Sequence, residues 1–119
     1  MEWTSEALRA AQEADSEIKP IFEWKETFQE PPGKEVVMLH GFATRSYVQQ
    51  WDKLHLMEDV LFRRWECSNG LYIAEQLVVP SEHRRAIIQL AREQGHFWVD
   101  RTAEQVQRRA YWVGWRRDV

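Results

Sequence analysis

The chain has little of several features that would place it in a familiar class of protein. Its 119 residues include one cysteine, which excludes an internal disulfide framework and is typical of a reducing compartment. It has no apolar run as long as a membrane span, and its first residues are unlike a signal peptide. No GxSxG, P-loop or HExxH motif occurs, and the carboxylates are scattered as ordinary solubilising charge. We therefore expect a soluble intracellular protein, cytoplasmic or nuclear, that has no membrane partner and is not an enzyme.

Lysine is missing from residues 80–119, where all positive charge comes from arginine. These residues carry 8 Arg and 5 acids, a net charge of +3, whereas residues 1–79 carry 8 Lys and Arg and 14 acids, a net charge of −6. The formal net charge of −3 for the whole chain hides this asymmetry. An arginine-rich segment indicates either a contact with an anionic partner or a solvated helix face, and the charge pattern leaves both open.

The composition also predicts a folded chain of modest size. Hydrophobic residues make up 44% and there are seven tryptophans, too much aromatic surface for a disordered segment. The length suits one domain or two small ones. We expect an α+β protein, with short helices and one β-hairpin followed by a small helical module.

Capping residues and helical spacing predict the elements before the hairpin, and the first two helices are expected to pack against each other. The predicted segments are a helix capped by Thr4 or Ser5, a helix from Asp15 or Ser16 to Lys25, irregular structure over 35–44, and a helix from Arg45 through Leu54.

The β-hairpin is predicted from two runs of strand-forming residues, 60–65 and 71–79. Asn69-Gly70 lies between them and suits a tight turn, because both positions tolerate positive φ. After it, Pro80-Ser81 opens a helix with Ile87, Ile88 and Ala91 inside. Thr102 is expected to cap a further helix that Gly114 ends, and Arg117-Asp118-Val119 to begin a third.

Six short sequence motifs occur in a specific order in the C-terminal part of the chain. They are Gln76 to Pro80, Gly95-His96, Arg101-Thr102, Tyr111-Trp112, Gly114-Trp115 and Arg117-Asp118-Val119. In this order they resemble the N-terminal HHCC zinc-binding domain of integrases from gypsy-type LTR retrotransposons and retroviruses. A looser match from Gln50 to Arg64 extends the resemblance into residues 1–79. The resemblance implies a division into residues 1–79, a segment preceding the zinc module, and residues 80–119, the module itself.

The zinc ligands of that family are mostly missing here. Arg92 stands where the family has its first histidine, and a guanidinium has no lone pair to donate. His96 is a residual ligand position only, and the sequence ends before the CxxC pair, as in a truncated module. A structural zinc site needs four donors. Zinc is implied for the family, but we expect this chain to bind none.

The remaining candidate ligands lack metal-ligand spacing and are expected to be surface or packing residues. They are His40, His55, His83 and Cys67.

A basic and aromatic cluster near the C-terminus is the candidate nucleic-acid-binding site. Arg108, Arg109, Arg116 and Arg117 alternate with Tyr111, Trp112 and Trp115. Arginines can neutralise phosphates and aromatic rings can stack on bases. The resemblance implies instead that the three aromatic residues form the core of the module, which we favour, and leaves the arginines open.

The resemblance implies a non-catalytic fragment of a retroelement integrase, because integrase catalysis is carried by three acidic residues of a separate domain. Its role would be to assist multimerisation and to hold the element's DNA end, with DNA and a second copy as partners. Two alternatives stay open. One is a metal-free protein-interaction module that uses exposed tryptophans, and the other is a retroelement remnant without a function.

Overall fold

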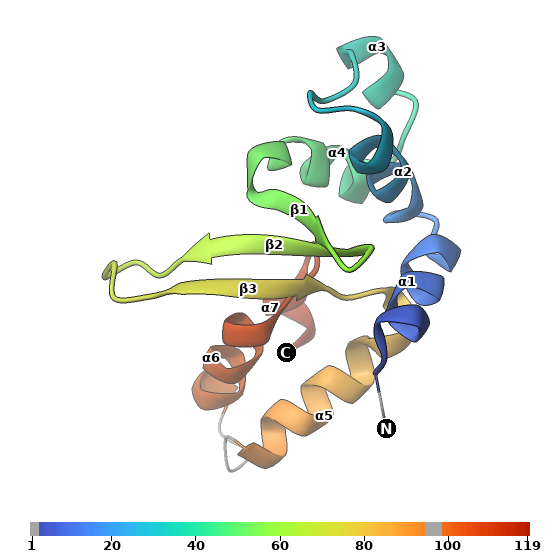
Figure 1. The fold of residues 1–119 in the computed structure, drawn as a ribbon. Helices are drawn as coiled ribbons and strands as arrows, with labels where there is room; N and C mark the ends of the chain where they lie inside the picture. The colour runs from blue at the N-terminus through green and yellow to red at the C-terminus, as the bar shows by residue number, and fades with distance from the viewer. Residues whose placement is uncertain (1–2, 95–98) are drawn as a thin grey trace. The chain divides into compact units, whose positions relative to one another are not determined.

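The computed structural model describes residues 3–94 and 99–119 (Figure 1). The fold is α+β as predicted, with short helices and a mixed sheet whose strand order is β1-β2-β3-β4. The chain forms two compact units, Met1–Leu61 and Phe62–Val119, which are described in turn. The division at residues 79 and 80 inferred from the sequence stays a prediction. No helix among the described residues is both long and apolar enough to cross a membrane.

The described part of the first unit is mainly helical. Its elements are α1 (Ser5–Ala14), α2 (Lys19–Thr27), α3 (Lys34–Val37), α4 (Phe42–Val48), the 3-10 helix η1 (Trp51–Lys53), β1 (Leu54–Met57) and the start of β2 (Val60–Glu66).

A side-chain cap begins α1, as the sequence predicts, whereas the cap predicted for the second helix at Asp15 or Ser16 is wrong, because α2 begins after Ile18 and has no side-chain cap. The Thr4 hydroxyl accepts a hydrogen bond from the Ala7 amide at 3.1 Å, and the Asp15 carboxylate accepts from the amides of Glu17 and Ile18 at 2.9 and 3.2 Å. These acceptors satisfy amides that have no partner inside the helix. The α2 helix packs against α1, which confirms the predicted pair.

The predictions for the rest of this unit were partly wrong. The segment 35–44 is not irregular throughout, because it contains most of α3 and the first turn of α4. The helix predicted from Arg45 through Leu54 ends at Val48, and Leu54 begins a strand. Leu54–Met57 forms β1, which lies beside β2 in the sheet after a turn at Glu58 and Asp59, whose φ values are both positive, at 51° and 61°. Positive φ at both central residues suits a two-residue hairpin turn.

A buried glutamine stabilises the first unit next to its apolar core. The Gln12 side chain is fully buried; it donates to the Leu61 carbonyl at 3.0 Å and accepts from the Leu61 amide at 2.8 Å. The Gln12 side chain therefore makes two hydrogen bonds from α1 to the backbone of β2, as a neighbouring strand would. The fully buried apolar side chains around it include Ile18, Ile21, Phe22, Tyr47 and Leu61.

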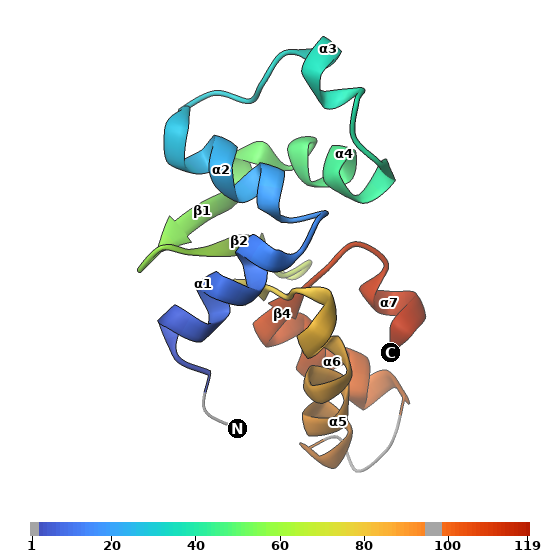
Figure 2. The same ribbon diagram turned by 90° about the vertical axis from the view of Figure 1, so that its right-hand side faces the viewer.

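The second unit is built from the end of the sheet and three helices among its described residues. The elements of this unit, in chain order, are the rest of β2, β3 (Ile73–Val78), the 3-10 helix η2 (Ser81–His83), α5 (Arg84–Gln94), α6 (Val99–Arg109), β4 (Ala110–Tyr111) and α7 (Trp115–Asp118). The α5 and α6 helices lie side by side, and α6 packs against β3 (Figures 1 and 2).

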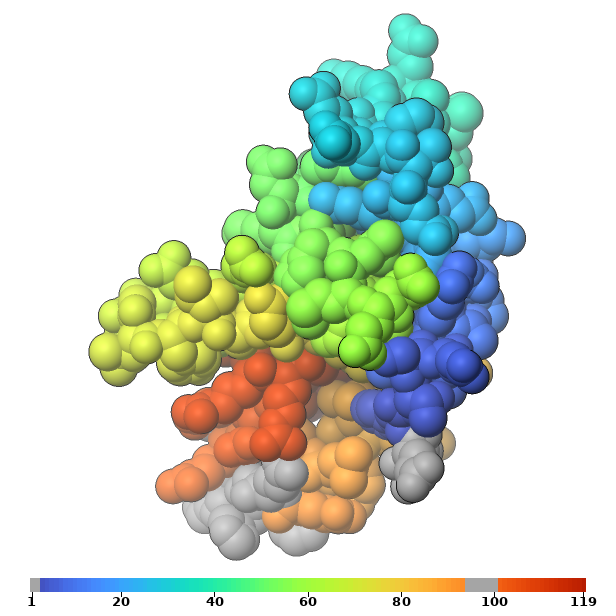
Figure 3. All heavy atoms as spheres, viewed as in Figure 1, coloured from blue at the N-terminus to red at the C-terminus, as the bar shows by residue number. Residues whose placement is uncertain are grey.

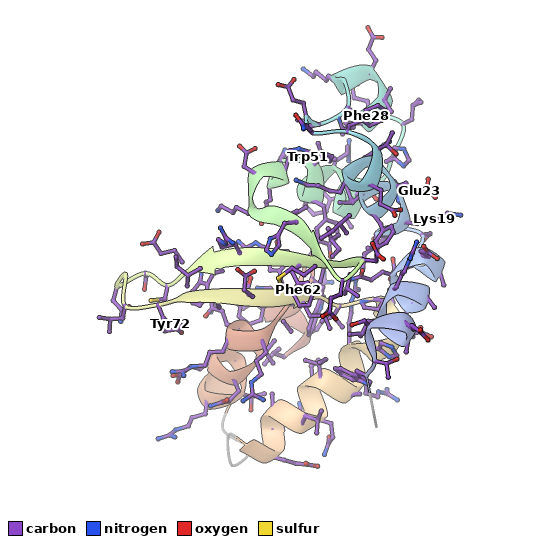
Figure 4. All side chains as sticks on the ribbon, in the orientation of Figure 1. Lys19, Glu23, Phe28, Trp51, Phe62 and Tyr72 are labelled. Carbon is purple, nitrogen blue, oxygen red and sulfur yellow. The ribbon has the colours of Figure 1, made fainter. Side chains whose placement is uncertain are left out.

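The predicted β-hairpin is confirmed. Strands β2 and β3 pair antiparallel from Phe62 opposite Leu77 to Glu66 opposite Ile73. The loop is longer than a two-residue turn, and positive φ is used at Gly70 alone, at 71°. Its yellow-green tip projects from the other elements of this unit in Figure 3, and Figure 4 places Tyr72 at the loop end of the hairpin.

The helix boundaries in the second unit differ from the predicted ones. The α6 helix begins at Val99, so Thr102 lies inside it, 2% exposed, and does not cap it. It ends at Arg109 and not at Gly114, because Ala110 and Tyr111 pair with Leu77 and Val78 as a parallel strand. Gly114, with φ of 88°, precedes α7.

Candidate nucleic-acid interface

Trp112 is the centre of the C-terminal unit's core. Its side chain is fully buried, and its indole N–H donates to the Asp118 carboxylate at 2.8 Å. The guanidinium of Arg84 lies 5.8 Å from the centre of the Trp112 ring and donates to the Val79 carbonyl at 3.3 Å. These contacts join α5, the segment after β4 and α7 around one ring. The core role implied for Trp112 by the resemblance is confirmed, whereas Tyr111 and Trp115 are half-buried.

The four arginines predicted as nucleic-acid contacts lie at the end of α6 and on α7, and all are exposed. Arg108 forms an ion pair with Glu104 at 3.1 Å and lies 5.4 Å from the Tyr72 ring centre. Arg116 lies 4.9 Å from the ring centre of Trp115. Arg117 pairs with Asp118 at 3.5 Å, yet its side chain stays 82% exposed. Exposed ion pairs of this kind are weak, so the charges remain available to phosphates.

Arg63 is a cation on the sheet that the sequence analysis did not select. Its guanidinium lies 4.2 Å from the Tyr111 ring centre and donates to the Gln76 side-chain oxygen at 2.7 Å. Gln76 in turn donates to the Gln107 carbonyl at 2.6 Å, which ties the hairpin to α6. Burial lowers the pKa of Arg63, and the Tyr111 phenol opposes this shift. Arg63 thus acts as a packing residue, and only the β2–β3–β4 pairing brings it to Tyr111.

The residues present do not fit a zinc ion. Arg92, at the first ligand position of the resemblance, is exposed on α5 and cannot donate a lone pair. Within residues 3–94 and 99–119 no group of three His, Cys, Asp or Glu side chains could hold a metal. His96, the residual ligand position, lies outside the described residues.

The other candidate ligands have structural contacts. Cys67 is buried in the hairpin loop, where its thiol donates to the Asn69 side-chain oxygen at 2.7 Å. The His40 ring meets the Trp24 ring edge-on with centroids 5.1 Å apart.

The expectation of exposed tryptophans was wrong for the part of the chain whose burial is described. Every described tryptophan is buried or half-buried. Other apolar side chains are exposed instead. Those of the first unit include Phe28, Val36, Met38, Leu39 and Phe42, and those at the hairpin tip are Leu71, Tyr72 and Ile73.

Comparisons with known proteins point to the same segment as the sequence motifs. Residues 79–119, about a third of the chain, match the family model described as the integrase zinc binding domain. This match supports the similarity of the segment to the N-terminal domain of retroviral and retrotransposon integrases. No curated protein matches the chain. No solved structure matches it either.

Proposed function

We propose that the C-terminal unit is a non-catalytic accessory module of a gypsy-type retroelement integrase that binds DNA through its arginines. The observation that carries the proposal is the arrangement at the end of the chain. Trp112 is fully buried, whereas Arg108, Arg109, Arg116 and Arg117 remain exposed. A surface of this kind binds the phosphate backbone without reading base sequence. Its implied roles in the integrase are to hold the DNA end and to assist multimerisation.

The arginines are better suited to this role than the aromatic rings. Trp112 cannot stack on a base while it remains in the core, and Trp115 already has the Arg116 guanidinium over its face. Binding should therefore depend mainly on charge and be similar for duplexes of different sequence. It should also weaken steeply as the salt concentration rises, since each neutralised phosphate releases counterions.

The test is fluorescence anisotropy of a labelled DNA duplex titrated with the full chain over a series of salt concentrations. Replacing both Arg108 and Arg109 by Ala should weaken binding and reduce the salt slope by about 2, roughly 0.9 per lost phosphate contact. The matched control is Lys34→Ala with Arg45→Ala, which removes two exposed cations from helices of the acidic first unit. Absence of salt-dependent binding by the natural chain would contradict the proposal.

One observation favours a second candidate, a metal-free protein-interaction module. In the first unit a hollow of about 620 Å³ is lined by Trp24, Phe28, Pro31, Pro32 and Val36. Met38, Leu39 and Phe42 follow it in the chain, and Leu39 is 84% exposed. Exposed apolar clusters mark association surfaces. Sedimentation should then show association that survives salt and is lost in a Leu39→Ser, Phe42→Ser variant.

The two candidates and a functionless remnant give different results. DNA binding that disappears with salt supports the first, and salt-resistant association supports the second. A chain that shows neither behaviour is the expected result for a remnant. Substitution of Trp112 is unsuitable for this comparison, because loss of a fully buried ring unfolds the core it centres.

A further inference from the structure

A hollow along α5 is lined by an unusual number of arginines. Its volume is about 490 Å³, and Arg84, Arg85 and Arg92 contribute to its wall together with Ser81, Gln89 and Asp118. None of these three arginines belongs to the group at the end of α6 and on α7. The hollow is therefore a second basic feature of the C-terminal unit, and we call it the α5 cleft.

The positive charge of the α5 cleft is largely uncompensated. Arg84 is held by the Val79 carbonyl and the Trp112 ring, neither of which carries a negative charge. Arg85 and Arg92 are exposed, and no described residue forms a hydrogen bond or ion pair with either guanidinium. The one carboxylate in the lining, Asp118, accepts from Trp112 and pairs with Arg117. Three cations facing one engaged carboxylate favour an anionic ligand.

Helical spacing determines which shape of anion suits this cleft. Arg85, Gln89 and Arg92 follow one another at intervals of four and three residues, so they lie on one face of α5. Seven residues of helix separate Arg85 from Arg92 by roughly 10 Å along the axis, at 1.5 Å per residue. Measured parallel to a duplex axis, that distance corresponds to the rise of about three nucleotides, at about 3.4 Å each. Two guanidiniums so spaced fit an extended polyanion better than one free phosphate.

Arg92 is a further reason to expect an anionic ligand in the α5 cleft. It occupies the position where the resemblance places the first zinc ligand, so a side chain that would bind a cation is replaced by one that repels cations. The arginine at this position also has a planar guanidinium, which can donate two parallel hydrogen bonds to the oxygens of one phosphate.

We propose that the α5 cleft binds the phosphodiester backbone of nucleic acid, with Arg85 and Arg92 each contacting a phosphate, while the Gln89 amide donates to Glu93 at 3.4 Å. The inference rests on the proposed function and deepens it by adding a contact surface separate from Arg108, Arg109, Arg116 and Arg117. Arg84 is a positioning residue that connects the cleft to the Trp112 core.

The test is anisotropy with a labelled DNA duplex, using the full chain and an Arg85→Ala, Arg92→Ala variant. Loss of two phosphate contacts should weaken binding by about tenfold or more near physiological salt and lower the salt slope by about 2. The Lys34→Ala, Arg45→Ala variant, which has the same change in charge, should bind like the natural chain. An Arg85→Lys, Arg92→Lys variant should retain the salt slope but lose part of the affinity, since lysine keeps the charge without the fork.

Each outcome decides between the two proposals. If the α5 variant, shown to be folded by circular dichroism, binds like the natural chain while Arg108→Ala, Arg109→Ala weakens binding, the α5 inference is wrong and the proposed function stands. If the natural chain shows no salt-dependent binding, the proposed function itself fails. If inorganic phosphate displaces DNA more effectively than chloride of equal ionic strength, and this excess is lost in the Arg85→Ala, Arg92→Ala variant, the cleft takes free phosphate and the backbone assignment is overturned. Displacement that follows ionic strength alone supports it.

Discussion

The indole N–H of Trp112 donates to the Asp118 carboxylate at 2.8 Å, and this bond connects the segment after β4 to α7. Zinc is expected to connect the corresponding parts of the integrase modules that this segment resembles, because their helices are too short to bury an adequate core. Here an aromatic ring with Arg84 on one side and Asp118 at its edge provides direct connections. The contacts of Trp112 therefore join α5, the segment after β4 and α7 directly.

Removal of this bond should destabilise the unit. An Asp118→Ala substitution leaves the buried indole N–H without its acceptor, at a cost of about 1–3 kcal/mol in the free energy of unfolding. Asp118→Asn keeps a side-chain oxygen and should cost less. The measurement is urea unfolding followed by tryptophan fluorescence. Equal stability of the alanine variant and the natural chain would show that the bond contributes nothing.

The buried Gln12 should be essential to the first unit. A Gln12→Met substitution keeps the volume of the side chain but leaves both the amide and the carbonyl of Leu61 without the bonds they now make. Each unsatisfied buried group costs about 1–3 kcal/mol, so we expect a loss of at least about 2 kcal/mol. The control is Gln49→Met, because Gln49 is exposed. A thermal melt in which the two variants behave alike would contradict this assignment.

Gly114 should resist substitution because of its backbone conformation. Its φ is 88°, and an added Cβ would lie 2.9 Å from the end of the Arg117 side chain. The side chain can move, but the left-handed backbone cannot be relieved, so Gly114→Ala should cost about 1–2 kcal/mol. Gly41→Ala is the control, since Gly41 has a φ of −74° and nothing within 4 Å of an added Cβ. Thermal melting compares the two, and an unchanged Gly114→Ala variant would be the unexpected result.

Sequence patterns predicted the local elements better than the long-range pairing. Asn69-Gly70 between two strand-forming runs was enough to locate the hairpin, and the capping residue Thr4 located the start of α1. The four-residue β1 and the two-residue β4 are too short to show a strand pattern. The β4 strand exists because Ala110 and Tyr111 pair with β3, which also moved the end of α6 away from Gly114.

In the candidate site, too, local features could be predicted from the sequence and long-range contacts could not. The core role of Trp112 followed from the resemblance, and the exposed arginines followed from charge. The Arg63–Tyr111 contact did not, since it joins residues that are distant in sequence. The expectation of exposed tryptophans was wrong because sequence does not show which rings tertiary packing covers, and every described tryptophan is buried or half-buried.

The most direct measurement is a thermal melt of the full chain in zinc and in a chelator, followed by circular dichroism. Cohesion of the C-terminal unit by Trp112, Arg84 and Asp118 predicts the same melting curve, with an unchanged Tm, in both conditions. A bound structural zinc at a hundred times its Kd would instead add about 2.7 kcal/mol, a rise in Tm of roughly 8 °C or more. A shift of that size, lost on His96→Ala, would contradict the metal-free account.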